Sequence, residues 1–305
     1  MNKSLLRTRK PMRFDLYVPS NFNDLIEYLN MNGTNAVLIA GGSDLMPRIK
    51  RQLIKPAVLV DLSPIRELHY IKRDGDQIRV GALSTISELA ASSILSGKYE
   101  AFRQVEMQYG GPAIRNIATI GGNVASAASS EDLIPVLLSL DATVAMKSVK
   151  GERSLPVKDF LVGKRKTILS HEELITEISF RELNSTSWCT FEKVGRRKSL
   201  IIALVSLAVC LDLDPESHKV NQIRVALNRV KEKIPQRVQE VEMFLAGKVL
   251  NDDTIVQSLK VLEDALSLTA DYRASAEYRV EAAKACLESA IKHCVKMMAS
   301  KREAV

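Results

Sequence analysis

With 305 residues, 46% of them hydrophobic and 26% charged, the chain has the composition of a globular protein and the length of two or three domains. Its apolar runs are too short to span a membrane, and its net charge of +7 comes from scattered basic clusters without the aromatic residues of a nucleic-acid-binding surface. The four cysteines form no C-x-x-C pair, so we expect no metal site in this chain and reduced thiols in the cytoplasm.

The first 62 residues are predicted to form a small β-α-β unit. Their apolar residues cluster or alternate as in strands, and they recur with helical spacing between those strands. In chain order, the expected elements are a strand at 13–18, a helix capped by Ser20 and ended by Gly33, a buried strand at 36–40, a short helix at 45–53 and another buried strand at 57–62.

The strand at 36–40 leads into a diglycine turn with the sequence Ala40-Gly41-Gly42-Ser43-Asp44-Leu45. Without a Cβ atom, glycine lets the backbone adopt a positive φ and approach another molecule closely. The N–H groups of such a turn can converge on an anion, and the Ser43 hydroxyl adds a donor. An ordinary tight turn is the alternative interpretation.

The segment 63–184 is predicted to mix strands and helices without the regular alternation of a doubly wound sheet, which favours an α+β fold. In chain order, we expect a helical turn capped by Ser63, a hairpin around Asp74-Gly75-Asp76, a helix at 86–91 capped by Ser84 or Thr85, a helix at 99–108 stopped by Gly110-Gly111-Pro112, a helix at 131–140 that opens with two acidic residues, and strands at 142–149 and 174–180.

A second diglycine follows, in the segment Ala118-Thr119-Ile120-Gly121-Gly122-Asn123. We expect a turn like the first, in which Thr119 and Asn123 supply a hydroxyl and an amide. Two such turns could hold a diphosphate between them. Neither turn matches G-x-G-x-x-G or G-x-x-x-x-G-K-[ST], so the Rossmann and P-loop interpretations lose their main support.

The residues from 185 to 305 are predicted to form a C-terminal domain after a polar linker at 182–187. The expected elements are a hairpin formed by 206–214 and 222–229 and helices at 238–246, 254–268 and 276–298. The apolar residues of the last helix recur at helical spacing, so we expect that helix to pack against the sheet.

Five further motifs accompany the two diglycine segments in order: Val60-Asp61-Leu62-Ser63, Gly81-Ala82-Leu83-Ser84-Thr85, Glu173-Leu174-Ile175, Phe191-Glu192-Lys193-Val194-Gly195-Arg196-Arg197 and Ala276-Glu277-Tyr278-Arg279. Together they resemble the FAD-binding, or medium, subunits of molybdenum hydroxylases, such as the flavoprotein subunits of carbon monoxide, xanthine, nicotinate and aldehyde dehydrogenases. The resemblance extends over residues 12–299. It implies an α+β chain with a two-part FAD-binding region of the PCMH type, at 1–62 and 63–184, and an α+β C-terminal domain of the CO dehydrogenase flavoprotein type at 185–305.

The resemblance also implies which residues bind FAD. The first diphosphate loop corresponds to Ala40, Gly41, Gly42, Ser43, Asp44 and Leu45, and the second to Thr119, Gly121, Gly122 and Asn123. Asp132 corresponds to an acceptor for the cofactor's hydroxyl groups, Leu174 to a residue beside the isoalloxazine, and Lys193 to a cation that could stabilise anionic reduced flavin. The alternatives are an acid at a helix N-terminus for Asp132 and a plain surface lysine for Lys193. Neither loop has a histidine for covalent attachment, so the resemblance implies non-covalent FAD, with no catalytic side chain or metal ligand in this chain.

By the same resemblance, the chain is expected to be the electron-transfer subunit of a molybdenum-containing hydroxylase or dehydrogenase. The implied partners are a large molybdopterin subunit and a small subunit with 2Fe-2S clusters, arranged as a dimer of heterotrimers, and an external electron acceptor. Two alternatives are a stand-alone FAD-dependent oxidoreductase of the same fold and an interaction protein that has lost its flavin. The segment Lys198-Ser199-Leu200-Ile201-Ile202-Ala203 departs from the family pattern, in which an aspartate precedes Ile-Ala, so the resemblance leaves the surroundings of the flavin ring open.

Overall fold

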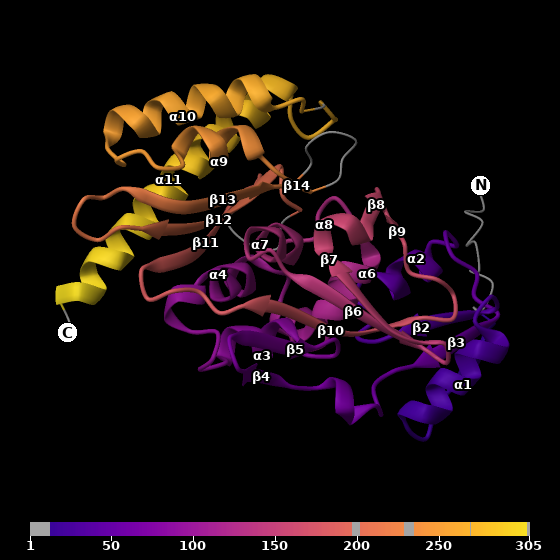
Figure 1. Cartoon of the computed structure of the whole chain (residues 1–305). Coiled ribbons are helices and arrows are strands. Elements are labelled where there is room, and N and C mark those ends of the chain that lie inside the picture. The colour runs from indigo at the N-terminus through magenta and orange to yellow at the C-terminus, as the bar shows by residue number, and fades with distance from the viewer. Residues whose placement is uncertain (1–12, 197–201, 229–234, 269, 304–305) are drawn as a thin grey trace, which may run out of the picture.

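The computed structural model describes residues 13–196, 202–228, 235–268 and 270–303. In this part of the chain the strands form three main sheets, each built from its own stretch of sequence (Figure 1). The N-terminal sheet lies at one end of the molecule, and the third sheet, with the long helix α11 (Ala276–Glu303), lies at the other. Helices α4 (Ala101–Gln108) and α7 (Leu133–Ser139) pack against the third sheet and share a core with the second.

The N-terminal sheet has three parallel strands in the order β1-β3-β2, as the predicted β-α-β unit requires. Its elements are β1 (Asp15–Tyr17), α1 (Phe22–Asn32), β2 (Ala36–Ile39), α2 (Leu45–Lys50) and β3 (Val58–Asp61). Leu25 of α1 shares one buried apolar cluster with Leu83 and Leu174, which belong to the second unit. This shared core fixes the first sheet, and the loop that follows β2, against the rest of the molecule.

Two of the predicted helix caps, Ser20 and Ser63, are wrong: each of these side chains bonds to a nearby aspartate instead. The side chain of Asn21, not of Ser20, caps α1 by accepting a hydrogen bond from the N–H of Asp24 at 3.0 Å, and the Ser20 hydroxyl donates to the Asp24 carboxylate instead. Ser63 donates its N–H and its hydroxyl to Asp61 rather than capping a helical turn. In both places a neighbouring polar side chain competes for the same role, and the residue types alone do not decide between them.

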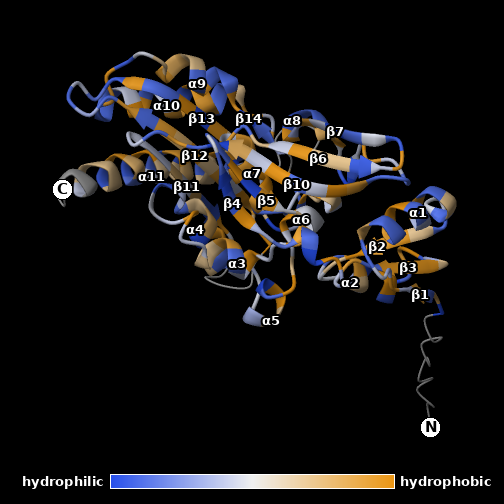
Figure 2. Ribbon diagram, turned by 60° about the horizontal axis from the view of Figure 1, so that its bottom comes forward, coloured by the Kyte–Doolittle hydropathy of each residue, from blue (hydrophilic) through white to orange (hydrophobic). Residues whose placement is uncertain are grey.

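The second sheet has five antiparallel strands in the order β4-β5-β10-β6-β7. The elements of this unit are η1 (Arg66–Leu68), β4 (Ile71–Asp74), β5 (Gln77–Gly81), α3 (Ile86–Ala91), η2 (Gly97–Tyr99), α4, α5 (Pro112–Arg115), α6 (Ile120–Ser126), α7, β6 (Thr143–Ser148), β7 (Gly151–Pro156), α8 (Val157–Phe160), the small ribbon of β8 (Leu161–Gly163) and β9 (Lys166–Thr167), and β10 (Leu174–Arg181). The predicted hairpin of β4 and β5 and the Thr85 cap of α3 are confirmed. Buried and partly exposed residues alternate along β6, and its hydrophobic Val144 and Met146 are buried. Figure 2 shows the hydropathy of the residues along this strand.

The prediction that Gly121 and Gly122 form a turn like the first is wrong, because both lie inside helix α6. The Thr119 hydroxyl caps this helix by accepting a hydrogen bond from the N–H of Gly122 at 3.1 Å. Position 121 requires glycine because the helix packs closely against its neighbour there, and not because the backbone has an unusual conformation. A Cβ atom there would lie 2.7 Å from the carbonyl oxygen of Ala82 and 2.8 Å from the Ala82 Cβ atom.

The third sheet has four antiparallel strands in the order β11-β12-β13-β14. The elements of this unit are β11 (Ser187–Val194), β12 (Val205–Leu213), β13 (Val220–Leu227), β14 (Gln236–Arg237), α9 (Gln239–Leu245), α10 (Asp252–Ala265) and α11. The predicted hairpin of β12 and β13 and the three helices are confirmed, whereas β11 was not predicted and begins inside the expected linker. Leu287 and Ile291 of α11 are fully buried against the sheet, which confirms the predicted packing of the last helix.

Gly121→Ala should destabilise the protein by about 1–3 kcal/mol, the usual cost of adding a methyl group to a well-packed site. The measurement is urea unfolding followed by the fluorescence of Trp188, the single tryptophan in the sequence. Gly163→Ala is the matched control, because a Cβ atom there would meet the Lys166 side chain at an ordinary contact distance of 3.5 Å. Equal stabilities of the two variants would contradict the packing role of Gly121.

Candidate cofactor-binding site

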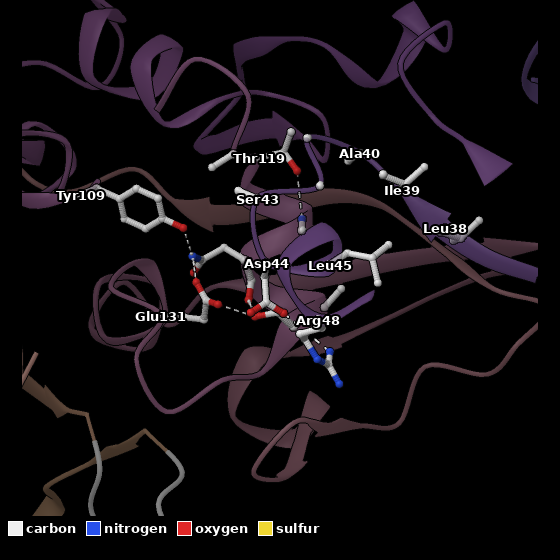
Figure 3. Close-up of a pocket in the computed structure, with 17 residues that line it drawn as sticks. Leu38, Ile39, Ala40, Ser43, Asp44, Leu45, Arg48, Tyr109, Thr119 and Glu131 are labelled. Carbon is white, nitrogen blue, oxygen red and sulfur yellow. Dashed lines mark hydrogen bonds and ion pairs between the residues drawn. The ribbon is translucent and has the colours of Figure 1, made fainter. Parts of the chain in front are cut away.

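A cavity of about 200 Å³ opens between the loop after β2 and helix α6, and Figure 3 shows the side chains that surround it. The residues that the resemblance assigned to FAD and that line this cavity are Ala40, Gly41, Gly42, Ser43, Asp44, Leu45, Thr119, Gly122 and Asn123. Four polar residues to which the sequence analysis assigned no role at this site also line it: Arg48, Tyr109, Ser126 and Glu131. The two diglycine segments therefore meet at one concave site.

Residues 41–44 of the first loop line this cavity. Within the described part of the chain, no carbonyl or side chain accepts a hydrogen bond from the N–H groups of residues 41–44. Gly42 has a φ of +65°, so the left-handed turn predicted here is confirmed. Free N–H groups on the concave side of such a turn form a typical binding site for an anion.

Gly41 explains why the two segments can come together. A Cβ atom at this position would lie 1.6 Å from the carbonyl oxygen of Ile117, which stands just before α6. Any side chain at position 41 would therefore push the first loop away from the second segment. The predicted close approach of a glycine backbone is present here, but its neighbour at this point is the protein's own chain.

The first turn of α6 forms the opposite wall. Gly122 keeps that wall open, because a Cβ atom there would come within 4 Å only of the Thr119 hydroxyl, at 2.9 Å. Asn123 is buried, and its Nδ2 donates to the Tyr109 hydroxyl at 3.3 Å and to the Glu131 carboxyl group. Its Oδ1 has no hydrogen-bond partner within the described residues. A buried acceptor of this kind calls for a donor, which a bound ligand could supply.

Glu131 is a carboxyl group in the cavity wall that the sequence suggested only as an acid at the start of a helix. In the structure α7 begins two residues later, and the Glu131 side chain accepts hydrogen bonds from Asn123 and, at 2.5 Å, from the Ser126 hydroxyl. Burial raises the pKa of Glu131 to about 8, although the bond from Ser126 opposes this shift. The group is therefore largely neutral at pH 7, which removes a negative charge from a cavity suited to an anion.

Asp44 also lines the cavity, and two arginines compensate its charge. Arg165, from the turn between β8 and β9, donates two hydrogen bonds to the Asp44 carboxylate, at 2.7 and 2.9 Å, and Arg48 lies 3.6 Å from it. The fork of the Arg165 guanidinium matches both carboxylate oxygens, which is the stronger geometry for such a pair. Asp44 therefore contributes little net negative charge to the cavity.

An apolar recess of about 80 Å³ adjoins the first cavity and shares part of its wall. Leu174 and Gly121, both assigned to FAD by the resemblance, line this recess together with Leu62, Leu83 and Ile175. An apolar recess next to a site with free N–H groups suits a ligand with a flat ring at one end and an anionic group at the other.

Asp132 and Lys193, the last two residues implied by the resemblance, form a buried ion pair beside the cavity and line neither space. Their side chains are 4% and 1% exposed, and Lys193 Nζ lies 2.5 Å from the Asp132 carboxylate, so the alternative of a plain surface lysine is wrong. Burial raises the pKa of Asp132 to about 6 even though the Lys193 charge opposes the shift. Lys193 also donates to the carbonyl of Gln108, while Asp132 Oδ1 has no partner among the described residues.

Residues 198–201, which belong to the segment that departs from the family pattern, lie outside the described residues. Among the residues that are described, no three or more His, Cys, Asp or Glu side chains gather so as to hold a metal ion. Across the same residues, no helix combines the length and the apolar character needed to cross a membrane.

The chain that forms this site is similar to known proteins over most of its length. Residues 12–180 match the FAD binding domain in molybdopterin dehydrogenase, and residues 190–294 match the CO dehydrogenase flavoprotein C-terminal domain. The chain is 30% identical to the 6-hydroxypseudooxynicotine dehydrogenase complex subunit alpha of Paenarthrobacter nicotinovorans, over 92% of this chain and 93% of that protein. It is 29% identical to the glyceraldehyde dehydrogenase medium chain of Sulfolobus acidocaldarius, over 92% and 98%. A chain of reconstituted CO dehydrogenase from Oligotropha carboxidovorans superimposes with a TM-score of 0.88 at 27% identity, over 95% of this chain and 100% of that one.

The raised pKa of Glu131 has a measurable effect on stability. Because folding raises this pKa from 4.5 to about 8, the stability that the carboxyl group contributes is complete below about pH 4.5 and is lost as the pH rises to about 8. Glu131→Gln removes the titration. The unfolding free energy of this variant, relative to the unmodified protein, should therefore rise over that range by up to about 1.4 kcal/mol per pH unit.

Urea unfolding at several pH values between 5 and 8 tests this. Glu216→Gln, which changes an exposed carboxyl group in the turn between β12 and β13, is the matched control and should give no such trend. A stability difference for Glu131→Gln that stays constant with pH would contradict the assignment of a buried, neutral carboxyl group.

Proposed function

The chain belongs to the family of FAD-binding medium subunits of molybdopterin dehydrogenases, and from this premise we propose that it holds FAD non-covalently between the loop after β2 and helix α6 and transfers electrons within an oxidoreductase complex. The observation that carries the proposal is that residues 41–44, whose N–H groups have no partner among the described residues, line a cavity together with Asn123, which has a buried, unpaired acceptor. These features fit a diphosphate flanked by hydroxyl-bearing groups.

The residues of this chain bind and orient the cofactor in this proposal. The N–H groups of residues 41–44 and the hydroxyl groups of Ser43 and Thr119 donate to the diphosphate, Gly122 leaves room for it, and Asn123 binds a neighbouring donor. The neutral Glu131 and the compensated Asp44 keep repulsion of the diphosphate low. Bound FAD would supply the ability to accept and release electrons singly or in pairs.

Leu174 and the apolar recess are proposed to receive the flavin ring, and Asp132 is proposed to accept a hydrogen bond from a cofactor hydroxyl through its unpaired Oδ1. Lys193 remains within the proposed binding set. Since it pairs with Asp132 at 2.5 Å and lines neither space, its first task is to hold that carboxylate in place, and we propose that its charge also favours anionic reduced flavin.

We further propose that the partners are a large molybdopterin subunit and a small 2Fe-2S subunit, assembled as a dimer of heterotrimers in the cytoplasm, and that electrons pass from the small subunit through FAD to an external acceptor. The support is that matched relatives are called medium chains and subunits of dehydrogenases, while this chain matches them over nearly their full length. Substrate selection then belongs to the large subunit.

Gly122→Asp should abolish FAD retention, because it places both bulk and negative charge against the proposed diphosphate position. The measurement is the ratio of visible flavin absorbance to protein after gel filtration with added FAD. Gly75→Asp is the charge control: it adds the same charge at a hairpin turn where a Cβ atom meets nothing within 4 Å, at a φ of +60° that aspartate adopts more readily than most other residues do. Undiminished flavin in Gly122→Asp would contradict the site.

A further inference from the structure

Two cysteines face each other across the third sheet. Cys189 of β11 and Cys210 of β12 are direct partners in the antiparallel register, so both side chains point to the same face. The N–H of Leu213 donates to the carbonyl of Thr186, another pair in this register, so the hydrogen-bonded pairs fall at even-numbered positions of β11. Cys189 and Cys210 therefore form a non-hydrogen-bonded pair.

Such a pair has the closer of the two backbone spacings in an antiparallel sheet, with Cα atoms about 4.5 Å apart. A disulfide needs Cα atoms about 4.4–6.8 Å apart, so the backbone already has a suitable spacing. In the structure both sulfur atoms are free thiols. Joining them requires side-chain rotation rather than movement of a strand.

The two thiols have different surroundings. The Nη1 atom of Arg224 lies 3.6 Å from the sulfur of Cys210, and the Ser139 hydroxyl lies 3.6 Å from the sulfur of Cys189. The hydrogen bond from the Cys189 thiol, assisted by the charge of Arg224, lowers the pKa of Cys210 below its usual value. The same hydrogen bond, together with burial, raises the pKa of Cys189. Cys210 is therefore the thiol of the pair that loses its proton more readily.

Cys210, with 3% of its surface exposed, is also the cysteine of the pair that borders a cavity. It lines a cavity of about 580 Å³ between the second and third sheets, which Arg224 lines as well and Cys189 does not. Most of the lining is polar, with Asp212, Gln222 and Arg181 among its residues. This cavity lies apart from the proposed FAD site and has no lining residue in common with it.

We propose that Cys210 and Cys189 form a reversible oxidation site for small hydroperoxides. The Cys210 thiolate attacks the terminal peroxide oxygen, the O–O bond breaks, and the released alkoxide takes up a proton to leave as an alcohol, or as water from hydrogen peroxide. The Cys189 sulfur then attacks the resulting sulfenic acid, and water leaves. Two thiols and one hydroperoxide become one disulfide, one alcohol and one water, so the sulfurs lose the two electrons that the peroxide gains.

The other two cysteines provide an internal control. Cys286 and Cys294 lie on α11 within the apolar core, and burial raises the pKa of Cys286 to about 12 and that of Cys294 well above its usual value. Neither lines the polar cavity. Both should therefore stay reduced under conditions that oxidise the pair.

The experiment treats the purified native protein, with its bound cofactor and partners, with hydrogen peroxide, followed by alkylation, trypsin digestion without reductant and mass spectrometry. The expected product is a disulfide between the tryptic peptides 182–193 and 199–219, lost again after dithiothreitol, while the peptides with Cys286 and Cys294 carry the alkyl label. Absence of the linked peptides, or equal oxidation of Cys286 and Cys294, would overturn the proposal.

Variants separate the two roles. Cys189→Ser should stop at a sulfenic acid on Cys210 that dimedone traps, whereas Cys210→Ser should leave Cys189 reduced, and the reverse pattern would overturn the assignment. Arg224→Gln should shift the pH profile of Cys210 alkylation to higher pH and slow the reaction at pH 7 by about tenfold if the thiolate pKa rises by about one unit. Arg224→Lys, which keeps the charge, should restore most of the rate, and an unchanged profile in Arg224→Gln would contradict the role of the arginine.

Discussion

The close approach of Gly41 to the carbonyl group of Ile117 is the contact on which the candidate site depends. It brings a loop that follows a parallel strand against the segment that opens α6, and the cavity exists because these two pieces meet. Two packing contacts elsewhere hold these two segments in position. The core that Leu25 shares with Leu174 holds the first sheet in place, and Gly121 seats α6 against Ala82. Gly41 and Gly121 are therefore required by the protein's own packing and Gly42 by its positive φ, whereas Gly122 leaves space for a ligand.

Three carboxyl groups around the cavity would repel a bound anion if they were charged and unpaired, and each is neutralised in a different way. Asp44 is neutralised by the bidentate pair with Arg165, Asp132 by the buried pair with Lys193, and Glu131 by protonation at pH values below about 8. In each case the carboxyl group can still form hydrogen bonds but adds no net negative charge to the site. A site whose lining arginine, Arg48, lies 3.6 Å from the Asp44 carboxylate can in this way still accept a diphosphate through backbone N–H groups.

Local patterns predicted much of the fold and the position of the site. The left-handed Gly42, the Thr85 cap and the stripe on α11 each follow from neighbouring residues, and the structure confirms them. Gly121 and Gly122 were misassigned because glycine is compatible with a turn and with a tightly packed helix, and only the contact with Ala82 decides. The partner of Asp44 could not be foreseen, since Arg165 lies 121 residues further along the chain. Glu131 was overlooked because its burial depends on tertiary packing around α6 and α7.

The central claim is that this chain is the FAD-holding subunit of a larger oxidoreductase. The most direct test is to purify the native protein, record its visible absorption spectrum, identify the flavin released by denaturation and identify the co-purifying chains by mass. We expect a flavin spectrum, FAD in the soluble fraction after denaturation, and one large and one small partner chain. A colourless protein that takes up no added FAD would contradict the claim, and a flavin-bearing chain that purifies without partners would contradict its place in a complex.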